Sequence, residues 1–178
     1  MSIDLSSVIA ATTQWLVSAY PAVGGPLTGA LAEAQARQAA TVAAWLRYPT
    51  SLDAELLTLT GPGGSAHLDW LVGADSEQPE PDRSGWRTWV DEVVASWAAT
   101  LLTDPALAAS ATAALEGSDH ASGSPVDFRR LTDPDARDRD AAALLRHPDC
   151  TGPLAALHRG ALLERLGTQR LAVDEADG

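Results

Sequence analysis

The chain has 178 residues, 46% of them hydrophobic, so it is long enough to bury one substantial core. Its 24 acidic and 12 basic residues give a formal net charge of −12, which disfavours binding to nucleic acids and to anionic membrane surfaces. The single cysteine, Cys150, excludes an intrachain disulfide.

The amino-acid composition favours helices. All 12 basic residues are arginine and alanine is abundant, a composition typical of a GC-rich bacterial genome. Alanine is the best helix former, and the single Phe and two Tyr add little β-propensity. The N-terminal residues lack the basic and apolar regions of a signal peptide, and no uncharged apolar run reaches the ~20 residues that a membrane span needs. We therefore expect a cytoplasmic protein.

The first third of the chain predicts three helices. Apolar residues recur at helical spacing over 3–20 and 27–47, and the Pro/Gly-rich segment 21–26 between them favours a turn. Pro49 ends the second helix, because the residue before a proline avoids the α conformation. The next segment, 51–60, favours a helix, although its leucines and threonines also fit a strand.

The middle of the chain contains the strongest predicted helix, 85–103, with Ser84 as its N-cap. It follows a Gly-rich loop at 61–65, which lacks the Lys-Ser/Thr of a phosphate-binding loop, and an acidic segment, 74–84, that contains two prolines. Large apolar residues lie on one arc of this helix, and we expect them to be buried. They are Trp86, Trp89, Val90, Val93, Val94, Trp97 and Leu101.

Proline also marks the predicted helix starts in the last third. Asp-Pro dipeptides at 104–105 and 133–134 place proline at the first helical position, where it is best tolerated. The first of these helices ends at Gly117 and the second before Pro148. The last helix is predicted over 153–167.

Three residues near the C-terminal helix have the side chains of a zinc site: His147, Cys150 and His158. Structural zinc requires a fourth ligand, and this set spans a proline break between two helices. We therefore predict no metal and no cofactor, with Cys150 as a buried thiol.

Ser65, His67 and Asp69 have the side chains of a nucleophilic or acid–base site. No nucleophile-elbow motif surrounds Ser65, and the spacing does not show that the three side chains point together. No catalytic residue is assigned.

These patterns together predict an all-α bundle of about six or seven helices joined by Pro/Gly turns. We expect one domain over 1–178. The alternative is two lobes, 1–73 and 85–178, joined by the acidic segment 74–84.

The predicted function is a non-enzymatic protein-interaction or adaptor module. The last helix carries apolar residues on two sides, which is typical of a helix between its own core and a second surface. Leu163 and Leu166 are expected to emerge on the second side, beside Arg159. We expect them to contact a protein partner or a second copy of the chain.

The alternative prediction is a small helical enzyme or a binding protein for an apolar metabolite. Six tryptophans are available to line a cavity between helices. Gln38, Trp45 and His158 are the candidate pocket residues, because each places a polar or aromatic group near an apolar stripe.

Overall fold

The computed structural model describes residues 5–74, 85–123 and 127–176, with side chains described as far as residue 168. These residues form ten α-helices and two 3-10 helices (η) and no strand, which confirms the all-α prediction. Six of the α-helices have seven or more residues, in agreement with the number expected. In chain order the elements are α1 (Ser6–Ala19), α2 (Pro26–Arg47), α3 (Ser51–Thr60), α4 (Ala66–Leu71), η1 (Gly85–Trp89), α5 (Glu92–Thr103), α6 (Pro105–Ala113), η2 (Ala121–Gly123), α7 (Arg129–Thr132), α8 (Ala136–Ala141), α9 (Ala143–Arg146) and α10 (Pro148–Ala176).

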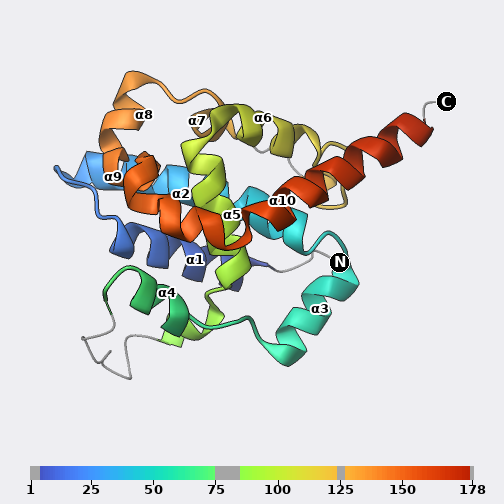
Figure 1. Ribbon diagram of the computed structural model, residues 1–178, viewed down its shortest axis with the longest axis horizontal. Coiled ribbons are helices and arrows are strands. Elements are labelled where there is room, and N and C mark those ends of the chain that lie inside the picture. The colour runs from blue at the N-terminus through green and yellow to red at the C-terminus, as the bar shows by residue number, and fades with distance from the viewer. Residues whose placement is uncertain (1–4, 75–84, 124–126, 177–178) are drawn as a thin grey trace.

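Helix α5 lies at the centre of the bundle, with α2 and α10 packed against it (Figure 1). Every residue from Val94 to Leu102 is buried, so this part of α5 has no solvent-facing side. Helices of both predicted lobes contribute to one hydrophobic core, which extends from Leu5 in the sequence to Leu166. The predicted linker lies, apart from Ala74, outside the described residues.

No single helix of the described part is long and apolar enough to cross a membrane. Helices α5 and α6 reach the length and apolar composition of a span only when taken together, and the chain bends by 119° between them.

The strongest predicted helix is divided in two. Residues Gly85–Trp89 form η1, and α5 begins only after Asp91, whose backbone is extended and whose Oδ1 accepts a 3.0 Å hydrogen bond from the Val94 N–H. The predicted cap, Ser84, lies outside the described residues. Of the seven residues expected to be buried, four are fully buried, whereas Trp86, Trp89 and Val93 are partly buried. The four fully buried residues are Val90, Val94, Trp97 and Leu101.

Segment 51–60 is a helix, not a strand. Thr50 and Asp53 form a reciprocal capping box: the Asp53 N–H donates to Thr50 Oγ1 over 3.2 Å, and the Thr50 N–H donates to Asp53 Oδ2 over 3.0 Å. Two otherwise unpaired backbone donors at the helix start are thereby satisfied. The local sequence thus explains why α3 begins where it does.

The two Asp-Pro dipeptides behave differently. Asp104 caps α6 as expected, with its Oδ1 accepting from the Leu107 N–H over 3.0 Å. Asp133, in contrast, ends the short helix α7, and the prediction that it begins a helix is wrong. Asp135 begins α8 instead, because it forms a capping box with Asp138. The predicted single helix before Pro148 is correspondingly divided into α8 and α9.

The last helix is longer than predicted, beginning at Pro148 instead of residue 153, and it bends at His158. The φ/ψ angles of His158 are −134° and 18°, outside the helical range. Its N–H donates to the Ser96 hydroxyl over 3.0 Å, and its carbonyl accepts from Trp97 Nε1 over 3.0 Å. Side chains of α5 therefore satisfy the backbone groups that the bend releases from α10.

A polar network around Arg146 joins the short helices to the core. The guanidinium donates to Gln35 Oε1 over 2.5 Å, to the Leu102 carbonyl over 2.9 Å and to the Arg130 carbonyl over 2.6 Å. Gln35 in turn donates to the Asp138 carbonyl over 2.8 Å, and the buried Asp138 carboxylate pairs with the Arg130 guanidinium. Burial lowers the pKa of Arg146 to about 10, which leaves it charged at neutral pH.

We expect Trp97→Ala to lower the free energy of unfolding by about 3–5 kcal/mol, because Trp97 is only 3% exposed and its truncation leaves a cavity. Trp70 is 65% exposed, and Trp70→Ala is the matched control with an effect within about 0.5 kcal/mol. Chemical denaturation measures both. A loss below about 1 kcal/mol for Trp97→Ala would contradict the central position of α5.

We expect Arg146→Met to lower the free energy of unfolding by about 3 kcal/mol or more, because each buried acceptor left without a donor costs about 1–3 kcal/mol. Arg139→Met removes a neighbouring exposed arginine and is the control. The measurement is urea denaturation of both variants. Equal stability of the two would mean that the Arg146 network does not hold α7–α9 in place.

Candidate functional site

Helix α3 presents three exposed leucines on one face. Leu52, Leu56 and Leu59 are 62%, 49% and 82% exposed, and their spacing of four and three residues aligns them along the helix. We call these three residues the leucine stripe. The opposite face of α3 is attached to the molecule through the buried Ala54 and Leu57. Figure 1 shows α3 at the edge of the bundle.

The charged residues of α3 itself are acidic. Helix α3 contains Asp53 and Glu55 and no basic residue. Glu55 is exposed and lies one residue from Leu56, whereas Asp53 is engaged in the capping box. The stripe is therefore an apolar surface with a negative edge.

A pocket of about 720 Å³ lies between the C-terminal end of α3 and the start of α5. Its wall includes the Gly-rich loop Gly61–Gly64, the end of α2, the start of α4 and the bend of α10. We call it the polar pocket, because ionisable side chains from four helices line it. They are Arg47, Tyr48, His67, Asp91, Glu92 and His158.

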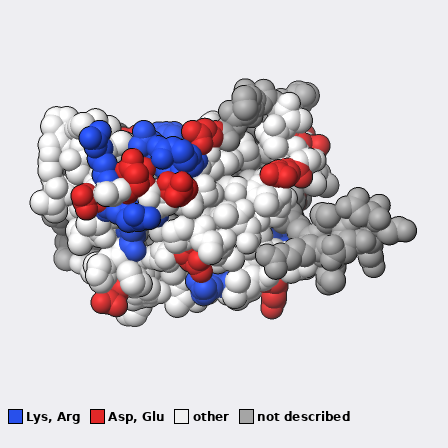
Figure 2. All heavy atoms as spheres, turned by 90° about the horizontal axis from the view of Figure 1, so that it is seen from above, with Lys and Arg blue, Asp and Glu red and all other residues white. Residues whose placement is uncertain are grey.

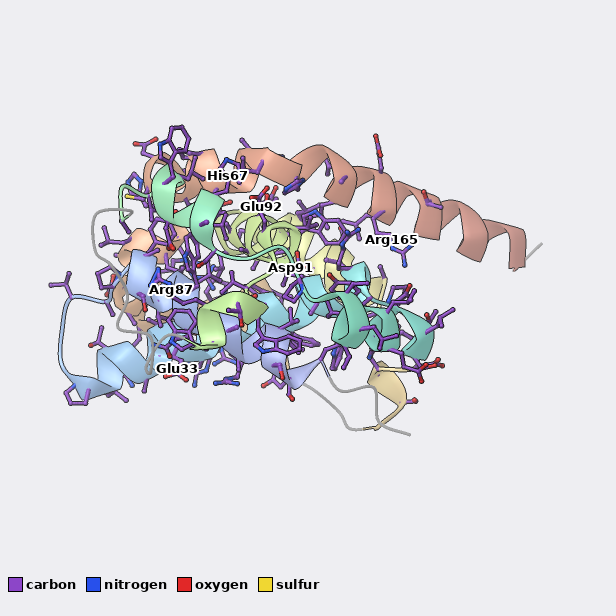
Figure 3. All side chains as sticks on the ribbon, turned by 90° about the horizontal axis from the view of Figure 1, so that it is seen from below. Glu33, His67, Arg87, Asp91, Glu92 and Arg165 are labelled. Carbon is purple, nitrogen blue, oxygen red and sulfur yellow. The ribbon has the colours of Figure 1, made fainter. Side chains whose placement is uncertain are left out.

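Glu92 joins two histidines at this pocket. Its Oε2 lies 2.6 Å from His67 Nδ1 and its Oε1 lies 2.9 Å from His158 Nε2. Figure 3 shows His67 and Glu92 close together beside α10, with Asp91 nearby. Partial burial acts to raise the pKa of Glu92, but the hydrogen bonds from His158 and His67 outweigh it and hold the pKa below its ordinary value. Glu92 is therefore ionised at neutral pH.

The ionised carboxylate fixes the protonation of the facing nitrogens. A carboxylate only accepts hydrogen bonds, so His67 Nδ1 and His158 Nε2 must each carry the proton that is donated to it. The other nitrogen of each ring, His67 Nε2 and His158 Nδ1, has no hydrogen-bond partner among the described residues. Each imidazole is thus oriented by Glu92 and keeps one nitrogen for a ligand or a proton.

Asp91 is engaged on both of its oxygens. Oδ1 caps α5 through the Val94 N–H, and Oδ2 accepts a hydrogen bond from the Tyr48 hydroxyl. Burial and this hydrogen bond raise the pKa of Tyr48, so the phenol stays protonated. Asp91 and Tyr48 therefore link the end of α2 to the start of α5 and form one wall of the polar pocket.

The predicted partner residues of the last helix do not share an exposed face. Leu163 is 45% exposed, but Leu166 is 6% exposed and belongs to the core. Arg159 is exposed and lies 3.6 Å from the Asp104 carboxylate. The prediction that Leu166 emerges beside Leu163 is wrong, because Leu162 and Leu166, one turn apart, together face the bundle.

The three predicted pocket residues lie in different surroundings. Gln38 joins α2 to α7, with its Nε2 donating to the Asp127 carbonyl and its Oε1 accepting from the Leu131 N–H. Trp45 stacks on His120 with ring centroids 5.3 Å apart. Only His158 lines the polar pocket. The structure therefore does not bring Gln38, Trp45 and His158 together.

Ser65, His67 and Asp69 do not form one site, because His67 points away from the other two side chains. Ser65 Oγ donates to Asp69 Oδ2 over 3.2 Å, whereas His67 turns away to Glu92. The other oxygen of Asp69 accepts from Trp15 Nε1 over 2.9 Å and from the Arg87 guanidinium over 2.5 Å. Asp69 thus holds α4 against α1 and η1 and does not orient His67.

His147, Cys150 and His158, which have the side chains of a zinc site, do not form a metal site. No group of three or more His, Cys, Asp or Glu side chains in the described part of the chain could hold a metal ion. Cys150 is exposed, so the expectation of a buried thiol is wrong. It lies in the first turn of α10.

Sequence reasoning missed the leucine stripe and the role of Glu92. The spacing of Leu52, Leu56 and Leu59 was visible, but the uncertainty between helix and strand in 51–60 hid the common face. The link from Glu92 to His67 and His158 spans 25 and 66 residues of sequence, and no local pattern indicates it.

We expect Glu92→Gln to lower the free energy of unfolding at pH 7 by about 1–2 kcal/mol, after allowance for solvent screening. Because the folded-state pKa of Glu92 is lowered, the stabilisation is present above the unfolded-state pKa and is lost as the pH falls through the folded-state pKa. The difference from the parent protein should therefore be fully present above the ordinary pKa of glutamate, about 4.3, and should close as the pH falls below that range. Urea denaturation between pH 3 and 7, with Glu55→Gln as an exposed control, measures it; a difference that persists unchanged at low pH would contradict the ionised bridge.

Comparison with known proteins gives no assignment. No protein-family model matches the chain, and neither a curated protein nor a solved structure matches it.

Proposed function

We propose that the protein is a non-enzymatic interaction module whose leucine stripe binds an amphipathic, basic helix of a protein partner. The observation that carries this proposal is the exposure of Leu52, Leu56 and Leu59 on one face of an edge helix. Full burial of an exposed leucine contributes about 1.5–3 kcal/mol. Three aligned leucines therefore supply a large part of the free energy that a helix-in-groove contact requires.

The charge favours a basic partner over a second copy of the chain. Two α3 helices packed about a twofold axis would bring the same acidic edge together, including both copies of Glu55. The net charge of −12 on each chain adds to this repulsion. A helix with arginine or lysine beside its apolar face would instead complement the negative edge.

Other charged surfaces support this choice of α3. On the face shown in Figure 2, basic and acidic side chains gather together toward the end where α8 and α9 lie. Helix α8 itself exposes charges of both signs, on Arg137, Arg139 and Asp140. Opposite charges side by side partly cancel, whereas α3 combines an apolar stripe with charge of one sign.

The proposal moves the predicted contact from the last helix to α3. Leu163 remains exposed, and its part in a contact stays a prediction. The residues named for the alternative, a protein for an apolar metabolite, do not share the polar pocket, because His158 lines it and Gln38 and Trp45 do not.

Binding is tested with a labelled synthetic helix that carries leucines at i, i+3, i+4 and i+7 and arginines beside them. We expect saturable binding in fluorescence anisotropy with a Kd of roughly 1–100 μM. A Leu56→Glu, Leu59→Glu double variant should weaken binding at least about tenfold, because it places charge on the stripe. Its circular dichroism spectrum should be unchanged, since both leucines are exposed.

Three controls make the result specific. Leu27→Glu alters another leucine, 68% exposed and outside α3, and should leave binding unchanged. A peptide of the same composition with its leucines scattered, and one with glutamates in place of arginines, should both bind weakly. Equal binding of all peptides, or equal binding by the double variant, would refute the proposal. A dimer in sedimentation that the double variant abolishes would identify a second copy as the occupant instead.

A further inference from the structure

We propose that the polar pocket binds a small molecule through an oxyanion, a phosphate or carboxylate group. This site is separate from the leucine stripe and does not depend on the interaction proposed for it. The juxtaposition that carries the inference is that of Arg47, the Gly61–Gly64 loop and the two histidines held by Glu92.

The carboxylates of the pocket are already occupied. Each oxygen of Glu92 accepts from one histidine, and each oxygen of Asp91 accepts from one donor, either the Val94 N–H or the Tyr48 hydroxyl. A ligand that offers hydrogen-bond donors would have to compete with these internal partners. The carboxylate oxygens of the pocket thus already have hydrogen-bond donors within the protein.

The hydrogen-bond donors of the pocket have fewer partners within the protein than its acceptors have. Arg47 is exposed and has no ion pair with a described acidic residue; its guanidinium lies 5.7 Å from the centre of the Tyr48 ring. The backbone N–H groups of Gly63 and Gly64 have no hydrogen-bond partner among the described residues. A ligand rich in acceptors and negative in charge would therefore complement the groups that remain.

The two imidazoles add donors when an anion is present. The nitrogens that face away from Glu92, His67 Nε2 and His158 Nδ1, accept in the neutral ring and donate in the charged ring. An anion bound beside these nitrogens favours the charged form of the rings. Anion binding should therefore be coupled to proton uptake and should strengthen as the pH falls from 8 to 6.

The charged and titratable groups of the pocket walls fit this coupling. Helix α2 contributes Arg47 and the protonated Tyr48, α4 contributes His67, α10 contributes His158, and α5 contributes Asp91 and Glu92. With both histidines protonated, the three cations outnumber the two carboxylates. A volume of about 720 Å³ is within the range of small-molecule sites, so the oxyanion can belong to a metabolite of moderate size.

The test uses the full chain and NMR of its four histidine side chains. Inorganic phosphate and succinate are titrated separately at constant ionic strength, with chloride as the balancing anion. We expect saturable shifts of the His67 and His158 resonances, a higher midpoint of their titration with bound anion, and at least threefold tighter binding at pH 6 than at pH 8. His120 and His147 lie outside the pocket and serve as internal references. Saturation by phosphate alone, by succinate alone or by both would assign phosphate, carboxylate or the shared oxyanion chemistry.

Two arginine variants complete the test. Arg47→Gln should weaken binding at least tenfold, whereas Arg37→Gln, on the same helix and paired with Glu33, should not change it. A backbone NMR spectrum of each variant confirms that it is folded. The Leu56→Glu, Leu59→Glu double variant should retain anion binding, which separates this proposal from that for the leucine stripe. Absence of saturable shifts, equal shifts of all four histidines, or unchanged binding by Arg47→Gln would overturn it.

Discussion

The contact between α5 and α10 through Ser96 is the interaction on which the arrangement of the molecule depends. The Ser96 hydroxyl is buried, accepts the N–H of His158 and donates to the carbonyl of Ala155 over 3.2 Å. Without these bonds, a bend in α10 would leave backbone groups unpaired in the core, where each would cost several kcal/mol. With them, α10 changes direction at His158 and brings that side chain to Glu92, one turn before Ser96 on α5. A single hydroxyl thus connects the core to the polar pocket.

The Arg146 network has a similar role at the opposite end of the bundle. Helices α7, α8 and α9 have only four to six residues each and could not form alone, since helix nucleation is unfavourable. Arg146 ties them to α2 and α5 by donating to a side chain and two backbone carbonyls. Charged side chains hold these helices in position. The buried Asp138 carboxylate pairs with Arg130 and also takes part in the capping box with Asp135. Apolar packing alone would leave these short segments without a defined register.

The sequence predicted the features that depend on local spacing and missed those that depend on distant contacts. The all-α class, the start of α6 at Asp104 and a helical α3 all follow from capping residues and periodicity. The choice between Asp133 and Asp135 as a helix start did not, because both precede helical residues and only Asp135 has an acidic partner three positions later that closes the box. The division at Asp91 was hidden by an apolar arc that continues through it. Leu166 was placed on the wrong side because the contacts of α10 with α5 decide which stripe of that helix is buried.

Helix α3 contributes to both the leucine stripe and the polar pocket. Its outer face carries the leucine stripe, and its inner face supplies Leu57 and Thr60 to the wall of the polar pocket. Only Ala54 and Leu57 fasten it to the core, between a proline and a run of glycines. A first ligand that orders a helix held by so few buried residues bears the entropic cost of fixing it. A second ligand on the other face then binds a helix that is already ordered and does not bear that cost. Were both proposed ligands to bind, each would alter the affinity for the other by the same factor, as thermodynamic reciprocity requires.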